Sequence, residues 1–268
     1  MGRLEFPMQS YPTDLTESQL ALLEMHLPKL EPHPRRKWDY LIIFNAIFYV
    51  LDNGIKWRAM PVNFPPWSTV YSYWRTWVKT DFWEDLNTVL REQVRLLEGR
   101  EHLQPSGCIM DSQSVKASEY ASERGFDGAK KINGRKRFLL TDTLGLVLKV
   151  HVTPANIKET DGGRDLLERL QGSFPRLAHL WVDQGFSFWE FRCWILGALN
   201  WTVEVTGKSV LNPGSEGFEV VPRRWVVERT FAWLMRCRRL VRDVERLSGT
   251  VESLIYACMT RLMLRRLA

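Results

Sequence analysis

The spacing of apolar residues changes near residue 104, and this change constrains the fold more than any other feature of the sequence. Before it, apolar side chains recur every three or four positions, as on the buried face of an α-helix. After it, short β-branched or alternating runs are bounded by Gly, Pro or Asn, as in β-strands. The pattern predicts an all-helical N-terminal region, residues 1–104, followed by an α/β domain, residues 105–268, with a mixed sheet flanked by helices.

Four helices are expected in the N-terminal region. The first begins at Thr16, because Gln19 three positions later completes the pattern of a capping box. The second ends at the glycine of "DNG", and Ser68 is expected to cap the third. The four helices are expected at about 16–27, 38–52, 68–80 and 81–97.

Strands and helices are both expected in the second part. The strand region at 136–155 contains a hairpin that turns at Leu144-Gly145. Three helical stretches separate or follow the strands, and the last of them reads as one long arginine-rich helix. The strands are expected within 107–118, 136–155, 177–186 and 201–209, and the helices at 161–171, 187–198 and 225–245.

The positive charge of the chain is concentrated after residue 104. The formal net charge is +6, but residues 1–104 hold 12 Lys and Arg against 13 Asp and Glu, whereas the remainder holds 25 against 18. A cationic surface favours a polyanionic partner, with nucleic acid as the first candidate.

Several classes of protein are disfavoured. The longest apolar run, 41–51, is about half of the roughly 20 residues that a membrane-spanning helix needs. No N-terminal segment has the form of a signal peptide, so we expect a cytoplasmic protein without a membrane partner. The four cysteines and five histidines have no zinc-ligand spacing. "TVEVTGKS" (202–209) lacks the first glycine of a phosphate loop, so no nucleotide cofactor is expected.

Three acidic residues are candidates for a metal site. Asp111 follows the apolar "CIM" of one expected strand, and Asp183 follows the apolar "LWV" of another; open α/β sheets place their ligands at strand ends. Glu228 lies in the arginine-rich helix. Convergent carboxylates supply the hard oxygen ligands that phosphodiester chemistry requires. A chain with 31 acidic residues will place some at strand ends by chance, so spacing alone does not decide.

Two groups of basic residues are candidates for contacts with a phosphate backbone. In the last helix, Arg224 lies four positions before Glu228, and residues 223–246 hold eight arginines against three acids. The second group holds five cations in eight residues before the hairpin, and a solvated loop is its alternative interpretation. The candidates are Arg224, Arg229 and Arg236 in the helix, and Lys130, Lys131, Arg135, Lys136 and Arg137 before the hairpin.

Several long blocks, in the correct order, resemble the DDE-type insertion-sequence transposases, in the branch numbered five. They are "NAIFYVLDNGIKWRAMPVNFPPWSTVYSYWRTW", "MDSQSVKAS", "GFDGAKKINGRKRFLLTDTLGLVLKVHVTPANIKETDGG", "LWVDQGF" and "RRWVVERTFAWLMRCRRL". The resemblance covers about residues 12–262.

The resemblance implies an RNase H-like catalytic domain that cuts DNA at the terminal inverted repeats of its element and joins the freed ends to target DNA. It places the catalytic and metal-binding triad on Asp111, Asp183 and Glu228. The implied cofactor is two Mg²⁺ ions, for which Mn²⁺ would substitute, and the implied working form is a homodimer on double-stranded DNA. Such a protein is bacterial and associates with the nucleoid when it is bound to DNA.

The chain departs from one signature of related transposases, Tyr-x2-Arg-x3-Glu-x6-Lys. Arg224 and Glu228 match it, but Val221 and Met235 occupy the tyrosine and lysine positions, with Arg236 one step beyond. A hairpin intermediate in DNA is therefore in doubt.

Two questions stay open at this point. The helices at 37–52 and 67–80 are candidates for a helix-turn-helix reader of the inverted repeat, although their region is nearly neutral. The alternatives to a transposase are a non-catalytic DNA-binding protein derived from one, and a nuclease without strand transfer.

Overall fold

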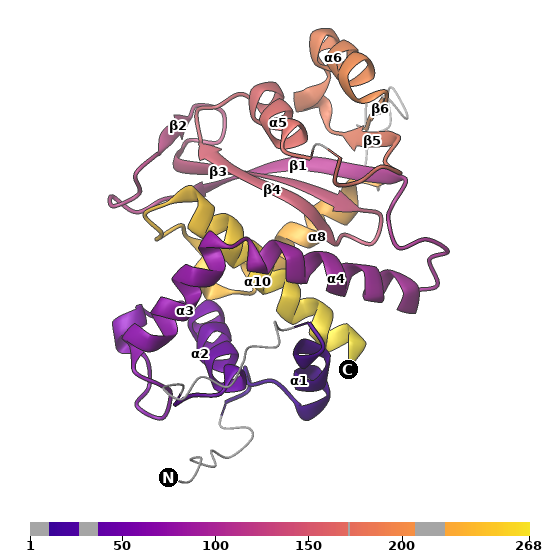
Figure 1. Ribbon diagram of the computed structural model, residues 1–268. Helices are drawn as coiled ribbons and strands as arrows, with labels where there is room; N and C mark the ends of the chain where they lie inside the picture. The colour runs from indigo at the N-terminus through magenta and orange to yellow at the C-terminus, as the bar shows by residue number, and fades with distance from the viewer. Residues whose placement is uncertain (1–10, 27–36, 171, 207–222) are drawn as a thin grey trace, which may run out of the picture.

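The computed structural model describes residues 11–26, 37–170, 172–206 and 223–268. A mixed β-sheet lies between two layers of helices (Figure 1). Helices α5 (Glu159–Glu168) and α6 (Trp189–Leu199) cover one face, and α4 (Phe82–Leu97), α8 (Arg224–Met235) and α10 (Ser248–Leu267) cover the other. This arrangement confirms the expected α/β architecture of RNase H-like type.

The sheet combines antiparallel and parallel pairs. Strand β1 (Gly107–Lys116) pairs antiparallel with β3 (Ile132–Asp142), which also pairs antiparallel with β2 (Gly125–Asp127) and β4 (Val147–Pro154). On its other side β1 pairs parallel with β5 (His179–Val182), which pairs parallel with β6 (Thr202–Val205).

The predicted hairpin is confirmed. It is the β3–β4 pair, and Gly145 has a φ of 78° at its turn, a conformation that favours glycine.

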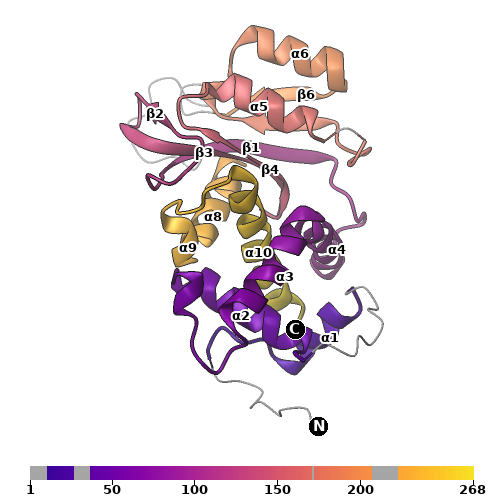
Figure 2. The ribbon, with the colours of Figure 1, turned by 60° about the vertical axis from the view of Figure 1, so that its left-hand side comes forward.

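The N-terminal helices stack below the helical layer of the sheet (Figure 2). They are α1 (Glu17–Glu24), α2 (Tyr40–Asn53) and α3 (Trp67–Lys79), and α4 connects them to β1 of the sheet. The long helix α10 packs against α1, α2 and α4 and against β4, so one apolar core runs from the N-terminal helices to the sheet. A second core fills the space between the other sheet face and helices α5 and α6. The boundary predicted at residue 104 therefore separates a helical region from an α/β region, and the two regions share this apolar core.

Local sequence signals explain where two of these helices begin and end. Thr16 and Gln19 form the predicted capping box, and Gly54 ends α2 with a φ of 68°. The predicted cap at Ser68 is wrong, because α3 already begins at Trp67 after Pro66. A proline suits this entry, since the first turn of a helix leaves N–H groups without partners in any case.

Two further expectations need correction. The helix predicted over 225–245 is broken after Met235, and a short helix α9 (Arg238–Val241) follows. The connection between α2 and α3 runs from residue 54 to 66 and contains the 3₁₀ turn η1 (Trp57–Ala59). It is longer than the three or four residues of a helix-turn-helix turn.

Among the described residues, no helix is long and apolar enough to cross a membrane. The end of the expected first helix, the "GKS" residues 207–209 and Val221 lie outside the described residues.

Candidate active site

The sheet brings Asp111 and Asp183 side by side. Met110 on β1 is the register partner of Val182 on β5, and each aspartate is the next residue of its chain. Strand β5 ends at this point, whereas β1 continues along β3 to Lys116. Asp111 therefore lies within β1, inside the strand region expected at 107–118, at the point where its parallel neighbour stops. The end of a parallel strand is where α/β sheets form ligand sites.

Asp111 lies on the face of the sheet that α8 covers. Ile109 belongs to the core shared with the helices α8 and α10, whereas Cys108 and Met110 belong to the core on the opposite face. Because side chains alternate along a strand, Asp111 shares the face of Ile109. Asp183 follows the last residue of β5, and both Arg224 of α8 and Glu159 of α5, which covers the opposite face, act on its charge.

Burial and a like charge act together on Asp111. The pKa of its carboxyl is raised to about 7, first by burial and then by the negative charge of Asp183. A hydrogen bond from the backbone N–H of Ser112, 2.6 Å from Oδ1, opposes these effects, as do the charges of Arg224 and Lys130.

The pKa of Asp183 is also raised, chiefly by burial. Glu159 adds to the increase, while Arg224, Lys130 and a hydrogen bond from the backbone N–H of Gly185 oppose it. This bond, 3.0 Å long, makes Asp183 the N-cap of the 3₁₀ turn η2 (Gln184–Phe186) and fixes the carboxylate at the end of β5.

Glu228 does not join the two aspartates directly. Its Oε1 lies 3.0 Å from Nε of Arg224, one turn earlier on α8, and both side chains are substantially exposed. Within the described ranges, no three acidic, histidine or cysteine side chains converge as a ready-made metal site. The structure thus brings together two acids of the predicted triad and connects the third to them through Arg224.

Arg224 and Lys130 are the two cations whose charges lower the pKa of both aspartates. Lys130 is exposed, and its Nζ lies 3.4 Å from the carbonyl oxygen of Ser112, next to Asp111. Asp127 holds the loop of Lys130 in place by accepting the backbone N–H groups of Ala129 and Lys130. Two predicted phosphate contacts therefore lie beside the acidic pair.

Three of the five cations before the hairpin are interior, which corrects the expectation of a five-residue clamp. Arg135 is fully buried and donates to Asp243 and to carbonyl groups that include that of Arg246. Arg137 is fully buried and donates to the carbonyl of Leu240. Each lies on a central strand, so its head group is used inside the protein.

Lys136 has a different role, which the sequence did not indicate. It is buried, and its Nζ lies 3.0 Å from Oε1 of Glu159 and 2.7 Å from the carbonyl oxygen of Ile157. Glu159 in turn acts on the pKa of Asp183. A charged residue in the first turn of a helix is common, so nothing in the sequence marked Glu159 as a neighbour of the site.

The remaining predicted DNA contacts differ in accessibility. Lys131 and Arg236 are exposed. Arg229 is half-buried between the rings of Trp225 and Trp233 and donates to the carbonyl of Leu144 at 3.0 Å. Its guanidinium is thus already engaged in holding α8 against the hairpin turn.

Fold and site together define the class of protein: an RNase H-like α/β protein with two neighbouring carboxylates, one within β1 and one directly after the end of the parallel strand β5. The family model "Transposase DDE domain" matches residues 102–263, more than half of the chain. A second family model, "Putative transposase of IS4/5 family", matches residues 15–87. The chain belongs to the DDE transposase family. A comparison with curated proteins finds no match.

Proposed function

We propose that this transposase binds the terminal inverted repeats of its insertion sequence, cuts DNA there in a metal-dependent reaction and joins the freed 3′ ends to target DNA. The single observation that carries the proposal is the juxtaposition of Asp111 and Asp183 on neighbouring parallel strands. Paired carboxylates at the end of a sheet suit the binding of divalent cations at a phosphodiester.

The donor set fits magnesium. Asp111 and Asp183 present carboxylate oxygens, and burial together with mutual repulsion raises the pKa of Asp111, so a cation between them would relieve an unfavourable pair of charges. We propose two Mg²⁺ ions, with Mn²⁺ as a substitute and Glu228 as the third acidic ligand. Bound there, the ions would activate a water for cutting or a 3′-hydroxyl for joining and stabilise the leaving oxygen of an in-line displacement.

The cations beside the acidic pair would position the substrate. Arg224 offers a planar guanidinium suited to a phosphate, and Lys130 approaches from the loop after β2. We expect these two to hold the scissile strand, with Lys131 and Arg236 as further exposed contacts. Two DNA ends have to meet before transfer, so the proposed working form is a homodimer on DNA.

The alternative with a specific observation in its favour is a DNA-binding protein without catalysis. That observation is the ion pair of Glu228 with Arg224, which occupies the third acid of the triad. A nuclease that cannot transfer strands shares the first chemical step with a transposase, so the two are separated by their products.

The test is incubation of the purified protein with labelled DNA from the flanks of its own gene, in Mg²⁺ and in Ca²⁺, beside Asp183→Asn. The expected result is Mg²⁺-dependent nicking at a repeat boundary, which the variant loses while it retains specific binding. Joining of the labelled ends to a plasmid distinguishes a transposase from a nuclease. Nicking by the variant at the parental rate would refute the site assignment, and specific binding without nicking by the parent would support the non-catalytic alternative.

A further inference from the structure

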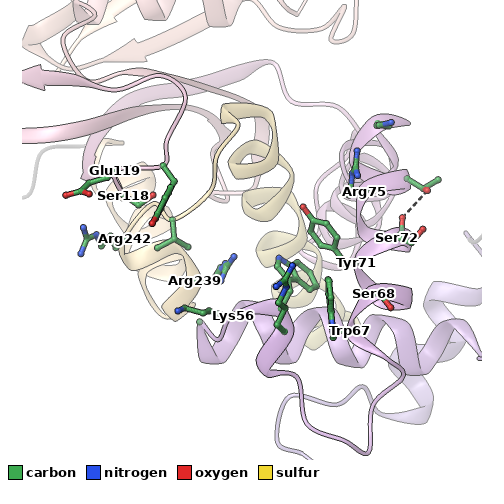
Figure 3. A pocket seen from close by; sticks show the side chains of 17 residues that line it. Lys56, Trp67, Ser68, Tyr71, Ser72, Arg75, Ser118, Glu119, Arg239 and Arg242 are labelled. Atoms are coloured by element: carbon green, nitrogen blue, oxygen red, sulfur yellow. Dashed lines mark hydrogen bonds between the residues drawn. The ribbon is translucent and has the colours of Figure 1, made fainter.

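A cleft of about 1220 Å³ lies on the side of the helical layer formed by α3, η1 and α9. Figure 3 shows α3 residues such as Tyr71 and Arg75 on one side, and Arg239, Arg242 and Glu119 on the other. None of its lining residues belongs to the acidic pair or to the cations beside that pair.

The charge of the cleft is almost entirely positive. Its lining has a single acidic residue, Glu119, among the described residues. Five exposed cations line it, and none of the five has an ion pair with another described residue. They are Lys56, Arg58, Arg75, Lys79 and Arg242. Uncompensated cations along a groove are the electrostatic footprint of a polyanion site.

A sixth cation, Arg239, lines the cleft, but its charge is compensated by an ion pair. Its Nη2 lies 2.6 Å from Oε1 of Glu245, and its Nη1 donates to the carbonyl of Ile55 at 2.8 Å. Because Ile55 follows α2 and Arg239 lies on α9, this side chain joins α9 to the start of the connection that carries Lys56 and η1. The site is therefore built into the packing of the helices.

Helix α3 presents two polar rows to the cleft. Trp67, Tyr71, Arg75 and Lys79 repeat every four positions and form one row, while Ser68, Ser72 and Thr76 form the other. Hydroxyl groups, arginine and lysine are the usual side-chain donors to phosphate and sugar oxygens.

Aromatic rings lie among these charges. The guanidinium of Arg58 lies 5.1 Å from the ring centroid of Trp67, and Tyr120, after β1, is strongly exposed. Trp57 packs against Tyr71 at 5.3 Å between ring centroids. A basic groove with aromatic side chains is the combination that follows a nucleic-acid strand.

We propose that this cleft binds the phosphodiester backbone of a DNA strand, as a second DNA contact apart from the acidic site. The inference rests on the proposed function in so far as that function makes DNA the substrate. Four of the five free cations come from the N-terminal region, and none of that region's described acidic residues lines the cleft, so its nearly neutral net charge did not disclose the site.

The test compares Arg75→Gln/Arg242→Gln with the parent by fluorescence anisotropy on labelled DNA over a series of salt concentrations. Duplex from the flanks of the gene and a single strand of the same length are both used, to show whether the cleft binds double-stranded or single-stranded DNA. Removing two phosphate contacts should reduce the magnitude of the slope of log K against log salt by about 2 on duplex or about 1.4 on single strand. Arg192→Gln, an exposed cation on α6, is the matched control and should leave the slope unchanged.

A smaller salt slope of the double variant on either DNA supports the proposal and shows which form of DNA the cleft prefers. Slopes equal to those of the parent on both DNAs would overturn it. As a readout that needs no variant, photocrosslinking of iodouracil-substituted DNA should label Tyr120 or Trp67, and labelling only outside the cleft would count against it. If the parent never cuts DNA but the cleft variant loses slope, the proposed reaction fails and the cleft stands.

Discussion

Arg224 and Glu228, one turn apart on α8, form an ion pair with Nε 3.0 Å from Oε1, and the same guanidinium lowers the pKa of both Asp111 and Asp183. Arg224 is therefore the side chain through which all three acids of the predicted triad are connected. An exposed i, i+4 pair is weak, so Glu228 gives up little when it exchanges this partner for another.

The first prediction concerns Arg224 as a phosphate contact. Arg224→Ala should weaken DNA binding at low salt and reduce the magnitude of the salt slope by about 1, because one phosphate contact is lost. Arg224→Lys is the control, since it retains the charge. The measurement is DNA affinity over a salt series, and a slope that Arg224→Ala leaves unchanged would contradict this role.

The second prediction concerns pH. The folded protein raises the pKa of Asp111 to about 7, so this carboxyl is protonated below that value and unable to bind a cation. Affinity for Mn²⁺ should therefore rise with pH through about 7. Since Arg224 lowers this pKa, Arg224→Ala should move the rise to higher pH.

Calorimetric titration with Mn²⁺ on both sides of that pH measures this effect. Asp111→Asn serves as the control, because it removes the titrating group and should abolish the step. An affinity of the parent that stays constant across the range would show that Asp111 does not titrate there or does not bind the ion.

Local patterns made Asp111 and Asp183 candidates, because each follows an apolar run typical of a buried strand. The patterns alone did not pair them: the family resemblance did, and the parallel pairing of β1 with β5 brings them together in the structure. The strand expected within 107–118 already extends past Asp111, but the sequence did not reveal that β3, more than twenty residues downstream, pairs with it over this length.

The burial of Arg135 and Arg137 could not be predicted from local sequence patterns. Five cations in eight residues are typical of a solvated loop, yet β3 begins at Ile132 and is paired on both sides. The partners of the two arginines, Asp243 and Leu240, lie more than one hundred residues later. The break in the helix after Met235 was also missed, since neither Gly nor Pro marks it.

The third prediction tests this interior role. Arg135→Ala leaves the buried carboxylate of Asp243 without its ion pair, so the free energy of unfolding should fall by about 3–5 kcal/mol. Lys131→Ala, four positions earlier and exposed, should change it by less than about 0.5 kcal/mol. Urea denaturation measures both, and equal effects of the two substitutions would argue that Arg135 is not structural.

The last prediction concerns Gly134, the register partner of Lys116 at the end of β1. A Cβ atom at this position would lie 1.9 Å from the carbonyl oxygen of Val115, and a backbone atom cannot swing aside as the end of a side chain can. Gly134→Ala should therefore separate the strands locally and destabilise the protein by at least about 1–3 kcal/mol, the usual cost of overpacking.

Gly128 provides the matched control, because a Cβ there meets nothing within 4 Å. Gly128→Ala should leave the urea midpoint close to that of the parent, whereas Gly134→Ala lowers it. Because β1 also carries Asp111, a Gly134→Ala protein that still folds should bind Mn²⁺ more weakly than the Gly128→Ala protein. Equal stability of the two variants would mean that β1 and β3 do not approach each other as closely as this register requires.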